Sequence, residues 1–254
     1  DSASTWYIKA AEVLAPVDSV NYSTLAVSYL GLGAVAARLS NFERGLVYFN
    51  RVEALALDYH NPSLQANAVS CKATLLGDEE KYDEAVPVAL RGLAIAQETG
   101  ENNSITALAG TLAICYIKLG KPEQALAYSK MALKNALDRH SANEMISANY
   151  VLGYNYVELK QYKIAKDYLL AGLELAEKNN EVDNITNAYG QLASAYEGLG
   201  LYKEALLYRN KYSDIRDSLL GGESAGRIAE VETKYRVAQK DKELAQKDKV
   251  LLQN

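Results

Sequence analysis

The sequence is poor in the residues that most catalytic and metal sites need. It contains two cysteines and two histidines, and none of them shows a paired metal-ligand spacing. Phosphate-binding loops of the G-x-x-x-x-G-K-[ST] type, G-x-S-x-G elbows and H-E-x-x-H helices are also missing. We therefore expect no catalytic constellation, no metal ion and no cofactor in this chain.

The few cysteines and histidines have structural interpretations. Cys71 and Cys115 are not in a C-x-x-C arrangement, so two free buried thiols are favoured and a disulfide is the alternative. His60 and His140 both lie near the ends of predicted helices, where the helix dipole favours a cation. Helix capping is therefore favoured over a phosphoacceptor role for both histidines.

Long apolar runs and excess positive charge are missing as well. No run of about 18 apolar residues is present, so we expect no membrane span in this sequence. The net charge of -5 argues against a surface dedicated to nucleic acid. The sequence opens at Asp1 without a methionine or a signal segment. We interpret it as a fragment or a processed form, which leaves the compartment open.

A regular forty-residue period organises the rest of the chain. Equivalent turn positions are occupied at equal intervals by Phe42, Tyr82, Pro122, Tyr162 and Tyr202. Self-similarity at such a period is typical of helical repeat arrays. The sequence predicts an all-α solenoid with the second helix of an incomplete repeat in residues 1–20, five helical hairpins in residues 21–220, and a separate segment in residues 221–254.

Small and aromatic residues recur at fixed places in this period. We expect close helix packing at two small-residue slots, and we interpret a shared tyrosine slot as packing rather than a binding ladder. The sequence also predicts a capping box at Ser141 and Glu144. The small slots are Gly33, Ala73, Ala113, Gly153 and Ala193, and Gly45, Ala85, Ala125, Ala165 and Ala205; the tyrosines are Tyr48, Tyr128, Tyr168 and Tyr208.

The hairpin pattern resembles the tetratricopeptide repeat. The resemblance rests on the order Leu152-Gly153…Tyr156 and Gly200…Tyr202…Ala205, and it covers roughly residues 25–217. The family period is usually about 34 residues, so a period of forty implies longer helices. The resemblance implies a right-handed superhelix without enzymatic activity. Gly45 and Lys72 depart from the usual Ala and Leu, which weakens single repeats only.

The last segment has a different pattern. Glycines at 221, 222 and 226 interrupt the array, and a charged heptad repeat follows. A seven-residue period favours a coiled coil, with a solvated single helix as the alternative. The expected dimerisation or relay stripe comprises Ile228, Val231, Tyr235, Val237, Leu244 and Leu251.

The segment carries a second resemblance. Residues 212–219 (YSDIRDSL) and 227–235 (RIAEVETKY) are similar to the end of the tetratricopeptide sensor module in Bacteroidota signalling proteins. The resemblance implies a bacterial two-component receptor in which a transmembrane helix and a histidine kinase, or a helix-turn-helix output domain, follow the array. It also implies a periplasmic location at the inner membrane, with the cytoplasm as the alternative, and a possible homodimer.

Binding is expected on the concave face of the array. First-helix positions that are not used for hairpin packing should line it and bind a peptide, a protein or a small ligand. Tyr150 and Tyr154 lie one turn apart, and we expect Asn187 and Gln191 of the next repeat near them. Replacing both tyrosines with alanine is expected to abolish binding without unfolding the array. A free-standing scaffold or adaptor is the alternative function. The candidate residues are Asn67, Ser70, Thr74, Lys118, Ser147, Tyr150, Tyr154, Glu158, Asn187, Gln191 and Ser194.

Overall fold

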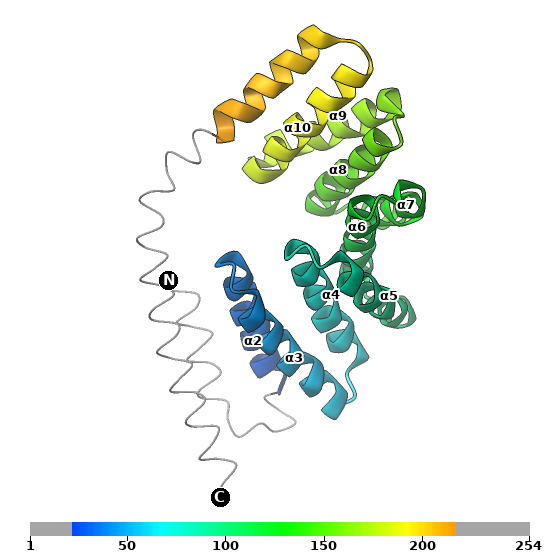
Figure 1. Cartoon of the computed structure of the whole chain (residues 1–254). Helices are drawn as coiled ribbons and strands as arrows, with labels where there is room; N and C mark the ends of the chain where they lie inside the picture. The colour runs from blue at the N-terminus through cyan, green and yellow to red at the C-terminus, as the bar shows by residue number, and fades with distance from the viewer. Residues whose placement is uncertain (1–21, 217–254) are drawn as a thin grey trace, which may run out of the picture. The chain divides into compact units, whose positions relative to one another are not determined.

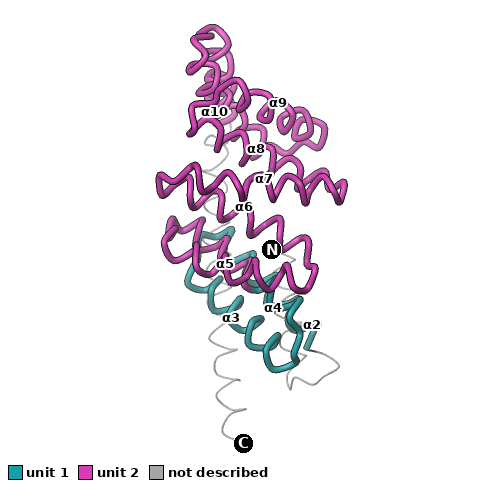
Figure 2. The backbone as a smooth tube through the Cα atoms, turned by 90° about the vertical axis from the view of Figure 1, so that its right-hand side faces the viewer, with its two compact units in different colours: residues 1–68, 221–254 teal, residues 69–220 magenta. Residues whose placement is uncertain are grey.

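The computed structural model describes residues 22–216 (Figure 1). The chain divides into two compact units, unit 1 with residues 1–68 and 221–254, and unit 2 with residues 69–220 (Figure 2). Each unit is described by itself. The predicted leading helix, the glycine segment and the six residues of the relay stripe lie outside the described residues.

The described residues form antiparallel helices at the predicted period. The second helices begin at Phe42, Tyr82, Pro122, Tyr162 and Tyr202, so the series predicted from the sequence is confirmed. Residues 202–216 are also helical. The labelled helices are α2 (Tyr22–Arg38), α3 (Phe42–Asp58), α4 (Pro62–Asp78), α5 (Tyr82–Thr99), α6 (Asn102–Lys118), α7 (Pro122–Asp138), α8 (Ala142–Glu158), α9 (Tyr162–Asn179) and α10 (Val182–Gly198).

One left-handed residue ends each helix from α2 to α10, at regular intervals along the chain. Glycine supplies the positive φ at positions 100, 120 and 200. Other residues supply it elsewhere, including His60 at 51° and His140 at 53°, although a side chain makes this conformation less favourable. The backbone N–H of each histidine donates to a carbonyl in the last turn, that of Leu57 or Leu137. The predicted position of both histidines at helix ends is confirmed.

The predicted capping box is wrong. Ser141 occupies the N-cap position of α8, but its side chain makes no capping hydrogen bond. Glu144 instead accepts two hydrogen bonds from the guanidinium of Arg139, at 2.7 and 2.9 Å. A carboxylate gains more from two charge-assisted bonds than from one backbone N–H, so the side chain turns away from the cap.

In unit 1, α2 and α3 pack as a hairpin around one glycine contact. A Cβ atom at Gly33 would overlap the ring of Phe49, so the helices approach closely only because this position carries no side chain. The rings of Tyr22 and Tyr59 stack with their centroids 4.2 Å apart. The Tyr22 hydroxyl also accepts a hydrogen bond from Nδ2 of Asn61, which fixes the start of α4.

In unit 2, the first helices of successive hairpins are neighbours. Helix α6 contacts α8, and α8 contacts α10, whereas no comparable contact joins α5 to α7 or α7 to α9 among the described helices. Figure 1 accordingly shows α6, α8 and α10 on one side and α5, α7 and α9 on the other. The array in unit 2 therefore bends with its first helices on the inside, and we call this surface the first-helix face.

Tyrosine pairs join the two helices of each of the last three hairpins in unit 2. Rings stack at centroid distances of 5.6 Å for Tyr116 and Tyr128, 5.8 Å for Tyr156 and Tyr168, and 5.4 Å for Tyr196 and Tyr208. The interpretation of the tyrosine slot as packing is confirmed for these pairs. Every member of both small-residue slots is also buried, as helix packing at these positions predicted.

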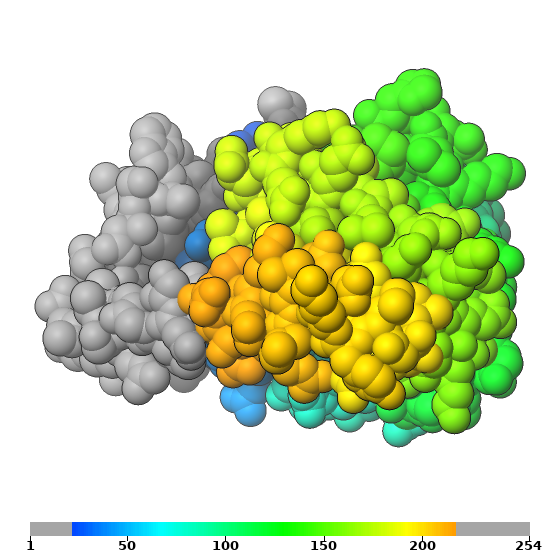
Figure 3. Space-filling view, turned by 90° about the horizontal axis from the view of Figure 1, so that it is seen from above, coloured from blue at the N-terminus to red at the C-terminus, as the bar shows by residue number. Residues whose placement is uncertain are grey.

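The last described helix, residues 202–216, lies at the surface of unit 2 (Figure 3). Tyr202 is 71% exposed, while Leu206 and Leu207 are more than half exposed. The equivalent Tyr162 is less exposed because its ring lies where a Cβ atom of Gly198 in α10 would be. Among the described residues, no following first helix covers Tyr202 in the same way.

A candidate ligand groove between α6 and α8

A groove of about 430 Å³ opens on the first-helix face of unit 2 between α6 and α8. Its size falls within the roughly 300–1,000 Å³ that ligand sites occupy. Most of its surface is apolar, with hydroxyl and carboxamide groups among the lining residues. The lining residues are Thr74, Asn103, Thr106, Ala107, Gly110, Thr111, Ile114, Ala132, Asn143, Glu144, Ser147, Ala148 and Val151.

The groove exists because α6 carries small residues where a larger side chain would fill the space. A Cβ atom added at Gly110 would meet nothing within 4 Å. Ala107 is exposed on the preceding turn and Thr111 follows directly. In α8, the position equivalent to Gly110 holds Tyr150. The hollow between α6 and α8 is therefore the space that a side chain occupies in the next repeat.

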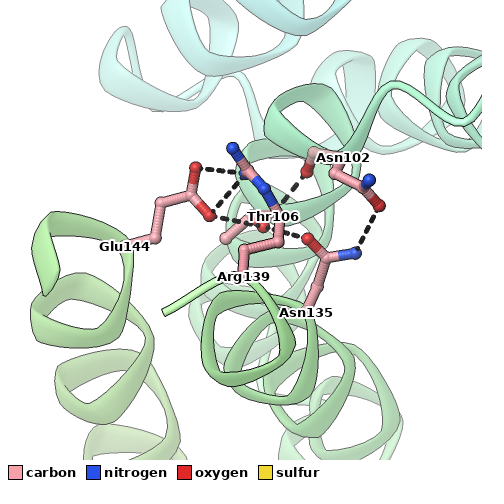
Figure 4. Close-up of polar contacts among 5 residues, drawn as sticks. All are labelled: Asn102, Thr106, Asn135, Arg139 and Glu144. Atoms are coloured by element: carbon pink, nitrogen blue, oxygen red, sulfur yellow. Dashed lines mark hydrogen bonds and ion pairs between the residues drawn. The ribbon is translucent and has the colours of Figure 1, made fainter. Parts of the chain in front are cut away.

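A polar cluster from three helices includes two residues that line the groove, Thr106 and Glu144 (Figure 4). The Thr106 hydroxyl lies 2.9 Å from Oδ1 of Asn135 and 3.1 Å from Oε2 of Glu144. It donates to one of them at a time. Nδ2 of Asn135 donates to Oδ1 of Asn102 at 3.1 Å, so the cluster ties α7 to both neighbouring first helices.

The charge of the cluster is compensated internally. Among the residues that line the groove, Glu144 is the only carboxylate, and Arg139 binds both of its oxygens. Both side chains are about a quarter exposed, so solvent screens the pair and its contribution to the free energy of unfolding is small. The groove therefore presents an electrically neutral, mainly apolar surface, which suits an uncharged ligand group.

The structure brings two of the predicted site residues into this groove. Thr74 and Ser147 are lining residues, and the Thr74 hydroxyl lies 3.2 Å from that of Thr111. Asn67 is exposed but belongs to unit 1, and Ser70 is buried. Neither of these two predicted residues lines the groove.

The remaining predicted residues lie beyond the groove on α6, α8 and α10. The rings of Tyr150 and Tyr154 stack at 6.2 Å, and Nζ of Lys118 lies 5.7 Å from the centroid of the Tyr154 ring. This is a cation–π contact between α6 and α8. The other predicted residues are the exposed Glu158, Asn187 and Ser194 and the partly buried Gln191.

Tyr150 packs against neighbouring apolar residues and is also one of the predicted binding residues. Burial raises its pKa to about 12, and the nearby Tyr154 adds to the rise, although a hydrogen bond with Gln191 acts in the opposite direction. Its ring packs against the apolar clusters on both sides of α8. Truncating Tyr150 should therefore cost stability, and loss of binding without unfolding in the double alanine variant stays a prediction.

Sequence reasoning missed the groove residues of α6. Asn103, Thr106, Ala107 and Gly110 were not among the predicted site residues. A usable signal was present, because alignment by one repeat period places Gly110 opposite Tyr150. The contacts of Thr106 with α7 and α8 carry no comparable signal, since they join residues 29 and 38 positions apart.

Neither cysteine forms a disulfide; Cys115 is buried and Cys71 is partly buried. Desolvation raises the pKa of each to about 11. Both therefore remain protonated at neutral pH, in a form that is a poor nucleophile and metal ligand. Within residues 22–216, no group of three or more His, Cys, Asp or Glu side chains is placed to hold a metal ion, and no helix is long and apolar enough for a membrane span.

Comparison with known protein families gives the same repeat. Residues 64–138 and 146–179 match models described as tetratricopeptide repeat. These parts of the chain are tetratricopeptide repeats. The matched segments contain α6 and most of α8, so the groove lies between two successive tetratricopeptide hairpins. No curated protein is significantly similar to the chain in sequence.

Solved structures share the fold at low sequence identity. BtubC (BKLC) from P. vanneervenii superposes with a TM-score of 0.70 at 18% identity, over 87% of this chain and 91% of that one. Aspartyl phosphate phosphatase F from Bacillus subtilis gives 0.67 at 14% identity, over 84% of this chain and 54% of the phosphatase. A Rap protein complexed with Competence and Sporulation Factor gives 0.64 at 16%, over 86% and 70%. Such identities establish the shared fold alone.

Proposed function

We propose that the chain is a non-catalytic sensor and interaction module of a bacterial signal-transduction receptor. The first-helix face binds a peptide, a protein or a small ligand, and the C-terminal segment with Ile228 and Val231 relays the event. The observation that carries the proposal is the groove between α6 and α8. A ligand there contacts two successive hairpins at once.

A ligand that bridges two hairpins has a means of signalling. If it binds more tightly at one angle between α6 and α8, it shifts the array toward that angle. The groove suits such a ligand because its apolar lining contributes affinity and its polar lining groups give orientation. The Rap protein complexed with Competence and Sporulation Factor supports binding by an array of this fold.

The identity of the receptor rests on the resemblance of residues 212–219 and 227–235 to signalling proteins. On that basis we propose a two-component histidine kinase as the parent, with the array in the periplasm and the kinase outside this sequence. A cytoplasmic transcriptional regulator is the alternative parent. A free-standing adaptor is the second candidate function, and the described hairpins suit it equally well.

Binding is tested by selecting peptides from a random library on residues 1–254. The groove is blocked by Ala107→Trp, because Ala107 is an exposed lining residue. The matched control is Ala127→Trp, which adds the same side chain at an exposed position of α7 that does not line the groove. We expect peptides whose affinity, measured by calorimetry, falls at least about tenfold in Ala107→Trp and stays unchanged in Ala127→Trp.

The same peptides test the relay. Sedimentation equilibrium with and without a groove-bound peptide should give different self-association constants if the C-terminal segment responds to binding. Equal constants would favour the adaptor. If no selected peptide distinguishes Ala107→Trp from Ala127→Trp, the groove is not the binding site and the proposed function fails.

A further inference from the structure

One position in each first helix of unit 2 points to the chemistry that the groove accepts. We call this position the ring slot, and its four copies are Ser70, Gly110, Tyr150 and Gly190. The copies share one register, because α4, α6, α8 and α10 begin at equally spaced positions, 62, 102, 142 and 182. They differ in what fills the space above them.

Two copies of the ring slot are filled by an aromatic ring. In α8 the ring is that of Tyr150 itself, which stacks on Tyr154 and is hydrogen-bonded to Gln191 of α10. In α10 the slot residue is Gly190, and the Tyr212 ring lies over it. Two atoms of that ring are 3.5 Å from where a Cβ atom of Gly190 would be. A glycine in this slot is thus compatible with a tyrosine ring supplied from another helix.

The Gly110 copy is the open one. Ser70 is 6% exposed and so already buried, whereas nothing lies within 4 Å of a Cβ atom at Gly110. Ile114 and Val151 provide apolar side chains beside this space. They stand at the positions that Tyr154 and Gln191 hold beside the Tyr150 ring.

The electrostatics of the open slot favour an uncharged group. The carboxylate of Glu144 is compensated by Arg139, and none of the residues that line the groove is a Lys or Arg. A ligand carboxylate or ammonium would lose hydration without gaining a partner of opposite charge. An aromatic side chain loses little hydration and gains packing on both walls.

We propose that the open ring slot at Gly110 is a pocket for an aromatic side chain of a peptide partner. The ring lies over Gly110 between Ile114 and Val151, as the Tyr212 ring lies over Gly190. The inference rests on the proposed function, since it names the chemistry of the ligand that the groove binds. It makes the aromatic residue the anchor of the partner.

The test uses capped tripeptides and the chain of residues 1–254 labelled with ¹⁵N. The probes are N-acetyl-Gly-Tyr-Gly-amide and its Leu and Ala counterparts, titrated while the amide signals of Gly110 and Val151 are followed by NMR. The Tyr probe is expected to shift both signals and to bind about tenfold or more tightly than the Ala probe, from the burial of one ring. It should also bind more tightly than the Leu probe.

Two variants test whether the probe binds at the ring slot or elsewhere on the first-helix face. Gly110→Tyr supplies the ring from the chain itself, as Tyr150 does, and should abolish the shifts caused by the Tyr probe. Asp183→Tyr adds a tyrosine at an exposed first-helix position of α10 outside the groove, and should leave the affinity unchanged. If Gly110→Tyr does not fold, Ala107→Trp blocks the same groove from the adjacent turn.

Three results of the probe titrations would overturn the inference. They are equal affinities for the Tyr and Ala probes, a Leu probe that binds as tightly as the Tyr probe, and shifts that avoid Gly110 and Val151. A library peptide that needs the groove but contains no aromatic residue would also overturn it, while leaving the proposed function intact. Failure of every probe and every library peptide at the groove would overturn both.

Discussion

The α6–α8 and α8–α10 contacts of unit 2 share one helix arrangement but differ in whether a side chain fills the space between the helices. Both join first helices that follow one another at the same repeat spacing. Between α8 and α10, Tyr150 fills the space and contacts Gln191. Between α6 and α8, Gly110 leaves a groove of about 430 Å³. The repeat thus fixes the backbone, whereas a single side chain decides whether the space between two helices is filled or left as a groove.

Truncation of Tyr150 should produce the largest loss in the free energy of unfolding at these two contacts. Tyr150→Ala removes a ring that packs on both sides of α8, and the free energy of unfolding should fall by about 3 kcal/mol. The α8–α10 contact would then resemble the α6–α8 groove. Urea denaturation measures the loss, with Tyr202→Ala as the control. Since Tyr202 is 71% exposed, a similar loss in both variants would show that the Tyr150 ring is not a packing element.

High pH should weaken the same contact. The pKa of Tyr150 is raised from 10.0 to about 12, so the folded state keeps a proton that the unfolded state has lost. Stability is therefore complete below pH 10 and falls as pH rises towards 12, by up to about 1.4 kcal/mol for each pH unit. Tyr150→Phe removes this ionisation. Denaturation curves at pH 9 and 11 should differ more in the parent chain than in the variant, and equal differences would refute the raised pKa.

A methyl group at Gly153 should disturb α8 itself. A Cβ atom there would lie 2.6 Å from Cγ of Leu169 and 3.3 Å from the backbone oxygen of Ala165. Because both atoms belong to the packed helix α9, we expect Gly153→Ala to lower the free energy of unfolding by about 1–3 kcal/mol. The equivalent residue of α6 is already Ala113, so Ala113→Gly tests whether the two hairpins differ. A neutral Gly153→Ala would mean that α8 and α9 separate easily.

The smallest change in the free energy of unfolding is expected at the open ring slot, Gly110. Gly110→Ala adds a methyl group that meets nothing within 4 Å, and it removes a flexible glycine from a helix interior. The free energy of unfolding should therefore rise by about 0.5–1 kcal/mol. Thermal unfolding of this variant beside Gly153→Ala measures two Gly→Ala changes of opposite sign. A destabilised Gly110→Ala would indicate that the groove is closed in solution.

Part of the fold could be read from the sequence because the evidence recurs from repeat to repeat. The turn at Tyr162, for example, is weak evidence alone but strong evidence beside Tyr82 and Tyr202. Predictions from a local motif that occurs only once in the sequence were less reliable. Ser141 and Glu144 match a capping box, but Arg139 competes for the carboxylate, and this competition depends on side-chain geometry. The groove was missed because it follows from the absence of a side chain at Gly110.

The sequence by itself determined the period, the helical hairpins in residues 22–216 and the tyrosine packing, because all three follow from spacing along one chain. Only the tertiary structure decided which first-helix positions meet. It placed Thr74 and Ser147 in the groove and buried Ser70. It also joined Thr106 to Asn135 and Glu144 across three helices. The physical reason is that repeats with one pattern still differ in side-chain volume, and volume acts only where two helices pack together.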